Sequence, residues 1–137
     1  MVGVVVVTHG RLSEELISAV KFVLSVKTAV KMEGVHLDPD REFESFKQEI
    51  KNAMKKVDEG DGILLVTDMF GGTPSNVSLT FLETNNVEVI SGVNLPMLLK
   101  LATLSSKITL DEAVKIAESA GRDNIIVASK LLQKRTP

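Results

Sequence analysis

The chain has 137 residues, of which 44% are hydrophobic and 25% are charged, the size and composition of one globular domain. Its 18 acidic and 16 basic residues give a formal net charge of −2 and are spread along the chain, which argues against a nucleic-acid-binding protein. The absence of cysteine excludes disulfides, thiol catalysis and thiolate metal sites. No apolar run approaches the roughly 18 residues that cross a bilayer, and the first residues lack signal-peptide features, so we expect a cytoplasmic protein without membrane insertion.

The first distinctive stretch is an unbroken valine run, Val4 to Val7, which is followed by Thr8-His9-Gly10. A run of β-branched residues that ends at a glycine predicts a strand buried on both faces, as in parallel sheets covered by helices. His9 then lies at the carboxyl end of that strand, the edge at which open α/β sheets bind ligands. The alternative is that His9 only caps a turn, and the strand by itself does not decide between the two.

Helices and strands alternate after this strand. Apolar residues at helical spacing follow Gly10, and a shorter strand with alternating apolar and polar residues runs from Val30 to Val35. Asp38-Pro39-Asp40 predicts the start of the next helix, because aspartate is a good N-cap and proline is tolerated in a first turn.

A second buried run, Ile63 to Thr67, ends at Asp68 and leads into a segment with the composition of a loop that opens a helix. This segment contains Gly71-Gly72, then Thr73 as the expected N-cap and Pro74 as the first helical residue. Taken alone, the two glycines would indicate no more than a sharp turn.

The last third of the chain predicts two more strands and two more helices. The strands are expected at Val87 to Ile90 and at Ile125 to Ala128. Asn94 is expected to cap a short helix, Thr109 to Glu112 to form a capping box, and Gly121 to end the helix that follows it.

This order of elements predicts an open, doubly wound α/β fold whose mostly parallel sheet has the flavodoxin-like strand order, is flanked by helices and ends in an antiparallel terminal strand. In that strand order the first and third strands are neighbours, so His9 is placed beside Asp68. We expect residues 1–130 to form a single domain and residues 131–137 to form a flexible C-terminal tail.

The juxtaposition of His9 with Asp68 predicts a nucleophilic histidine. A carboxylate that accepts a hydrogen bond from one imidazole nitrogen fixes the tautomer and leaves the other nitrogen as an outward lone-pair donor. If the electrophile is a phosphoryl group, its oxygens can be held by the backbone N–H groups of Gly71-Gly72-Thr73 and by the hydroxyls of Thr73 and Ser75. We therefore take His9 and Asp68 as candidate catalytic residues and Gly71, Gly72, Thr73 and Ser75 as candidate phosphoryl-binding residues.

Three separated motifs of the chain resemble the mannose/fructose-family enzyme IIA component of the bacterial phosphoenolpyruvate-dependent sugar phosphotransferase system. The motifs are Val7 to Gly10, Asp68 together with Phe70 to Asn76, and Gly92 to Leu98. They occur in the right order, and the resemblance covers nearly the whole chain.

The resemblance implies that His9 accepts a phosphoryl group from the carrier protein HPr and passes it to a histidine of a separate enzyme IIB during sugar uptake. It also implies that Asp68 orients the imidazole and that Thr73, where many members carry serine, contacts the phosphoryl group. A homodimer in which the terminal strand crosses between subunits is a further implication. The expected phosphotransferase component has no cofactor and no metal of its own.

Three other functions remain open from the sequence. The first is a regulatory protein phosphorylated on histidine. The second is the phosphocarrier subunit of dihydroxyacetone kinase, a protein with a similar fold and a similar histidine. The third is a small tetrapyrrole metal chelatase, which would need a second histidine in the cleft, and His36 is the other histidine of the chain. We expect His36 to have a structural or solvent-exposed role instead.

Overall fold

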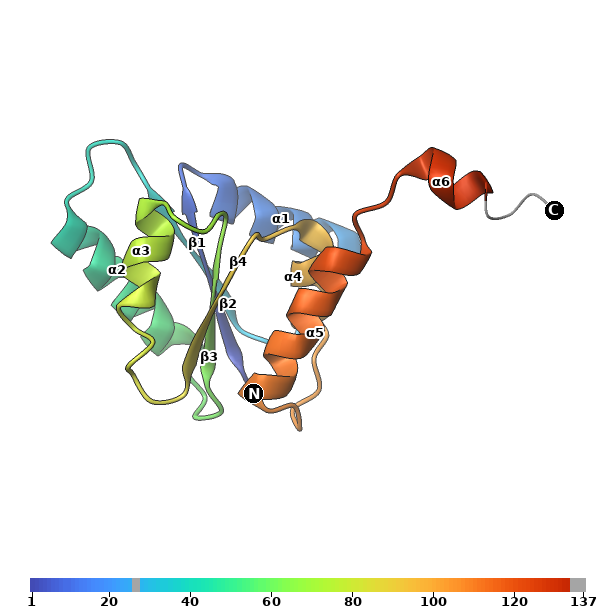
Figure 1. The fold of residues 1–137 in the computed structure, drawn as a ribbon. Helices are drawn as coiled ribbons and strands as arrows, with labels where there is room; N and C mark the ends of the chain where they lie inside the picture. The colour runs from blue at the N-terminus through green and yellow to red at the C-terminus, as the bar shows by residue number, and fades with distance from the viewer. Residues whose placement is uncertain (26–27, 134–137) are drawn as a thin grey trace.

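The computed structural model describes residues 1–25 and 28–133. It has an α/β fold in which one β-sheet lies between two layers of helices (Figure 1). The elements are, in chain order, β1 (Gly3–His9), α1 (Leu12–Leu24), β2 (Met32–Leu37), α2 (Phe43–Val57), β3 (Ile63–Thr67), α3 (Thr73–Leu79), β4 (Val87–Ser91), α4 (Leu95–Ala102), α5 (Leu110–Asp123) and α6 (Ala128–Gln133).

Within the described residues the sheet has four strands, all parallel, in the order β2-β1-β3-β4. The predicted adjacency of the first and third strands is confirmed, with Val7 of β1 opposite Thr67 of β3. Both of these inner strands are buried along their apolar runs, as predicted for strands covered on both faces.

Successive residues of the inner strands supply two separate cores, because side chains alternate across a strand. Val4 and Val6 face one core with α1, α4 and α5, whereas Val5 and Val7 face the other with α2 and α3. The same two helical layers are visible on either side of the sheet in Figure 1. The rigid carboxyl ends of β1 and β3 therefore emerge between the two layers.

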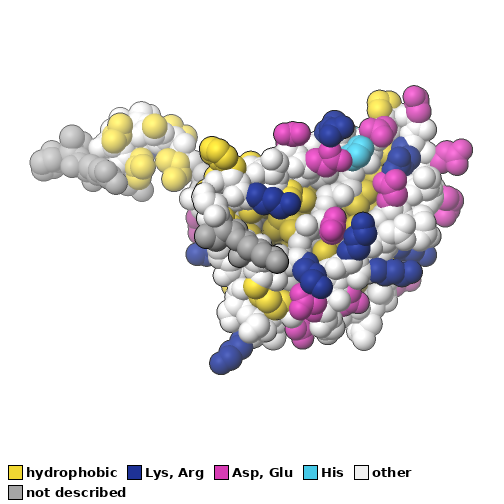
Figure 2. All heavy atoms as spheres, turned by 180° about the vertical axis from the view of Figure 1, so that it is seen from behind, with side chains coloured by type: hydrophobic (Ala, Val, Ile, Leu, Met, Phe, Trp, Pro, Cys, Tyr) yellow, Lys and Arg dark blue, Asp and Glu magenta, His cyan; other side chains and the backbone are white. Residues whose placement is uncertain are grey.

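The predicted antiparallel terminal strand at Ile125 to Ala128 does not form within the described residues of the single chain. After α5 the backbone leaves the domain, and the segment leads into α6, which projects away from the body (Figure 1). A strand needs a neighbour to satisfy its backbone groups, and the segment does not reach the exposed edge of β4. Its apolar side chains stand clear of the main body in Figure 2. Of the predicted tail, residues 131–133 complete α6, and residues 134–137 lie outside the described part.

Three predicted helix boundaries also differ. The second helix starts at Phe43 rather than at Asp38-Pro39-Asp40, since these residues form a turn in which the Arg41 N–H donates to the Asp38 carbonyl. Gly72, not Thr73, is the N-cap of α3. Gly121 does not end α5, which continues to Asp123. Its lack of a side chain instead lets α5 pack closely against Met97, because a Cβ at Gly121 would lie 3.0 Å from Met97 Cε.

The other two predicted caps are confirmed. The Asn94 side chain accepts a hydrogen bond from the Met97 N–H at 3.0 Å, and its amide donates to the Gly121 carbonyl at 2.9 Å. Thr109 and Glu112 form the capping box of α5. None of the helices in residues 1–25 and 28–133 is both long and apolar enough to span a membrane.

Candidate active site

The two predicted catalytic residues meet where the inner strands end. His9 is the last residue of β1, and Asp68 directly follows β3. The register that pairs Val7 with Thr67 carries both chains to the same edge of the sheet. The parallel pairing thus brings together two side chains that are 59 positions apart in the sequence.

Asp68 holds His9 through two hydrogen bonds to one carboxylate oxygen. Oδ2 lies 2.8 Å from Nδ1 of the imidazole and 3.0 Å from the main-chain nitrogen of His9. The second oxygen, Oδ1, accepts a hydrogen bond from the Met69 N–H at 3.0 Å. An ionised carboxylate only accepts hydrogen bonds, so the neutral ring carries its proton on Nδ1 and its lone pair on Nε2.

The two side chains differ in their access to solvent. The Asp68 side chain is 12% exposed, whereas the His9 side chain is 48% exposed. The carboxylate is therefore fixed and shielded, while the ring is open to another molecule. This combination suits a nucleophile that exchanges a group with a reactant arriving from outside.

The glycine loop lies directly against the imidazole. A Cβ placed on Gly72 would be 2.7 Å from Cε1 and 3.0 Å from Nε2 of His9, so only glycine fits there without displacing the ring. Gly71 has φ of +95°, a backbone conformation that favours glycine. The free nitrogen of His9 is thus next to the main chain of the loop that precedes α3.

The loop and the strand ends enclose a shallow hollow of about 310 Å³ at this edge. His9 and Thr73 both line it, which places the Thr73 hydroxyl-bearing side chain on the rim beside the imidazole. Ser75 is different, because it is fully buried and its Oγ has no hydrogen-bond partner among the described residues. The structure brings His9, Asp68, Gly72 and Thr73 together and buries the Ser75 side chain.

A family model described as "PTS system fructose IIA component" matches residues 3–118 of the chain. The chain belongs to this family. The resemblance to the mannose/fructose-family enzyme IIA (EIIA) component of the sugar phosphotransferase system (PTS) is thereby confirmed.

Curated relatives of this EIIA component include the "PTS system mannose-specific EIIAB component" of Escherichia coli strain K12, which is 28% identical over 139 residues. That alignment covers 99% of this chain but 42% of the relative, so the chain spans less than half of that protein. The "PTS system fructose-specific EIIA component" of Bacillus subtilis strain 168 is 28% identical over 93 residues, covering 67% of this chain and 64% of the relative.

Solved structures share the fold of this EIIA component. The PTS component EIIA from Streptococcus agalactiae superposes with a TM-score of 0.83 at 22% identity, over 95% of this chain and 99% of that chain. The PTS IIA protein associated with the fucose utilization operon from Streptococcus pneumoniae gives a TM-score of 0.80 at 25% identity, over 96% of each chain.

Arg41 is a residue of the EIIA hollow that the sequence analysis did not single out. It lines the same hollow as His9 and Thr73, and its guanidinium forms an ion pair with Glu49 of α2. Its Nε is buried without a hydrogen-bond partner among the described residues. The available signal was its place in the loop after β2, since loops at the carboxyl ends of parallel strands surround the site.

The second histidine of this EIIA component is engaged with carboxylates. His36 Nδ1 lies 2.7 Å from Glu14, and its Nε2 lies 3.6 Å from Asp38. No cluster of three or more His, Asp or Glu side chains with an arrangement that could hold a metal ion is found in residues 1–25 and 28–133.

Proposed function

We propose that His9 is the phosphoryl carrier of this EIIA component, accepting the group on Nε2 from phospho-HPr and passing it to a histidine of EIIB. The single observation that supports this role most directly is the Asp68 contact, which occupies Nδ1 and leaves Nε2 as the second nitrogen of a ring that lines the open hollow. Family membership supplies the two protein partners, and the cytoplasm remains the expected compartment.

In the proposed transfer the phosphoryl group passes directly from one histidine nitrogen to another. The Nε2 lone pair of His9 attacks phosphorus, a new N–P bond forms, and the N–P bond to the HPr histidine breaks with its electron pair returning to that nitrogen. As the bond forms, positive charge develops on the imidazole, and the Asp68 carboxylate stabilises it through Nδ1–H. Transfer to EIIB repeats the same exchange, with His9 as the leaving group.

We propose that the loop before α3 receives the phosphoryl oxygens. Gly72 is close enough to Nε2 for the main chain of Gly71-Gly72-Thr73 to approach a group bound there, and the Thr73 hydroxyl is on the same rim. Ser75 contributes through its main-chain N–H in the first turn of α3, because its side chain is buried. Arg41, which lines the hollow together with Asp38, is the cation that we expect to interact with the dianionic group.

We also propose that the protein works as a homodimer. Ile125, Ile126 and Val127 are 77%, 56% and 53% exposed, and Leu132 of α6 is also exposed. So many apolar side chains on one projecting segment indicate a protein partner. The unpaired edge of β4 is a suitable receiver, since a strand from a second copy can satisfy its backbone groups.

The experiment that tests the carrier role is phosphorylation of the purified protein by phosphoenolpyruvate, enzyme I and HPr. We expect one acid-labile, alkali-stable phosphoryl group per chain, absent in His9→Ala and retained in His36→Ala. Addition of EIIB should discharge it. A phosphorylated His9→Ala protein, or loss of labelling in His36→Ala with an intact fold, would contradict the assignment.

A further inference from the structure

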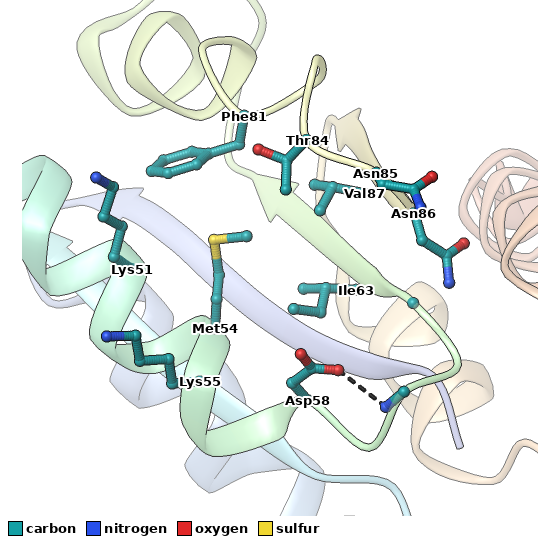
Figure 3. A pocket seen from close by; sticks show the side chains of 12 residues that line it. Lys51, Met54, Lys55, Asp58, Ile63, Phe81, Thr84, Asn85, Asn86 and Val87 are labelled. Carbon is teal, nitrogen blue, oxygen red and sulfur yellow. Dashed lines mark hydrogen bonds between the residues drawn. The ribbon is translucent and has the colours of Figure 1, made fainter.

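A second hollow lies at the opposite edge of the sheet from His9. It has a volume of about 470 Å³ and is bounded by α2 on one side and by the segment between α3 and β4 on the other (Figure 3). Ile63 and Val87, the first residues of β3 and β4, lie at its base. The five residues of β3 separate this hollow from Asp68, a distance of roughly 16 Å for an extended strand.

The base of this hollow is apolar. Met54 of α2 and Phe81 extend into it from opposite sides, above Ile63 and Val87 (Figure 3). These four side chains are buried with respect to the whole molecule, so the base is a firm part of the second core rather than a mobile surface. A flat or apolar group that enters the hollow can therefore remove water from preformed apolar surface.

Two ammonium groups stand on the α2 rim. Lys51 and Lys55 are four positions apart, so they project from the same face of the helix, one turn from each other. Neither forms an ion pair with a carboxylate of the described chain, although the protein as a whole carries a net charge of −2. A third cation on this face, Lys47, lies over the Phe81 ring at 5.7 Å.

The opposite rim carries neutral hydrogen-bonding groups. Thr84, Asn85 and Asn86 supply a hydroxyl and two amides (Figure 3). Asn86 has φ of +64°. Its side-chain amide packs against Gly62, where an added Cβ would lie only 3.1 Å from the amide atoms. The Asp58 carboxylate also lines this hollow, at its lower end, and accepts a hydrogen bond from the Gly60 N–H at 2.9 Å (Figure 3).

We propose that this hollow, defined by α2, the start of β3 and the segment after α3, binds a small phosphomonoester that carries a planar ring, the class to which nucleoside monophosphates belong. Lys51 and Lys55 bind the phosphate, the ring lies on the apolar base, and the asparagine amides pair with polar atoms on the ring edge. The volume is within the roughly 300 to 1,000 Å³ range of small-molecule sites. The site is distinct from the His9 hollow and leaves the carrier surface free.

The test is a titration of the full-length protein with adenosine 5′-monophosphate, followed by NMR. Resonances of Met54, Phe81, Asn85 and Asn86 should shift, and those of His9 should not. Adenosine, which lacks the phosphate, and inorganic phosphate, which lacks the ring, should each bind more weakly. Binding that needs only one of these two parts would contradict the proposed ligand class.

Two double variants distinguish binding by Lys51 and Lys55 in the hollow from a general effect of the protein's net charge. Lys51→Gln with Lys55→Gln should weaken binding by about tenfold or more, since two charge-assisted contacts are lost. Lys56→Gln with Lys107→Gln removes the same charge from outside the hollow and should leave the affinity unchanged. Equal affinity in both variants, no shift in the wild type, or shifts at the His9 edge alone would overturn the proposal. Phosphorylation of His9 in the Lys51/Lys55 variant reports on the carrier role independently.

Discussion

Gly72 and His9 are in direct contact across the site, so that a single methyl group on Gly72 would overlap the imidazole at Cε1 and crowd Nε2. The loop is therefore a wall of the histidine site as well as a turn. Asp68 holds the other side of the ring, which leaves the imidazole little freedom to move away.

We predict that Gly72→Ala lowers the rate of His9 phosphorylation by at least about tenfold, because the ring or the loop must shift from the transfer geometry. Rapid-quench transfer from phospho-HPr measures the rate, and imidazole nitrogen NMR reports the ring. Gly71→Ala is the control for the position of the imidazole ring, which should not change in that variant. There a Cβ meets nothing within 4 Å, so the change brings a backbone strain of about 1 to 3 kcal/mol without touching His9. An unmoved imidazole in Gly72→Ala would contradict the prediction.

Asp68→Asn is predicted to slow phosphoryl transfer by about 10- to 100-fold, the range found when the carboxylate partner of a metal-ligating histidine is removed. The amide is uncharged, so it no longer stabilises the positive charge that develops on the ring. Nitrogen NMR should also show loss of the fixed tautomer. The Asp68 oxygens accept main-chain N–H groups of His9 and Met69, so the melting temperature must be measured alongside. A normal rate with a changed tautomer would remove Asp68 from the mechanism.

The order of the inner strands and the pairing of His9 with Asp68 could be predicted because local pattern identifies the two strands and the flavodoxin-like strand order makes them neighbours. Valine-rich runs bounded by glycine favour doubly buried strands, and parallel pairing brings the carboxyl ends of such strands to one edge of the sheet. The path of Ile125 to Val127 could not be predicted. A segment forms a strand only when its backbone pairs with the edge of a sheet, and the sequence pattern does not say whether that edge belongs to the same chain or to another one.

Two features of the site depended on details that sequence patterns do not fix. Ser75 was expected to face the phosphoryl group. However, α3 begins at Thr73, which places Ser75 on the side of the helix that faces the protein interior, so its side chain is buried. Arg41 reaches the hollow because Asp38 to Arg41 form a turn before α2 instead of its first helical turn. A shift of a helix start by a few residues changes which side chains face the site.

Arg41→Gln is predicted to shift the phosphotransfer equilibrium with HPr toward unphosphorylated EIIA by about threefold, since one partly exposed cation contributes up to about 1 kcal/mol near a dianion. The shift should shrink at high salt, which screens the charge. Glu49→Gln is the matched variant, because it removes the ion-pair partner and leaves the guanidinium in place. It should not reduce phosphorylation. An equal shift in both variants would indicate a structural effect instead.

The projecting segment leads to a prediction about assembly. Ile126→Asp places a charge in the apolar stretch that we propose to pair with a second copy, so the dimer should dissociate at micromolar concentration. Light scattering after size-exclusion chromatography measures the mass. Ser129→Asp is the control, because it adds the same single negative charge on α6 at an exposed position that is already polar. A monomeric wild type, or a dimer that persists in Ile126→Asp, would show that this segment does not form the interface.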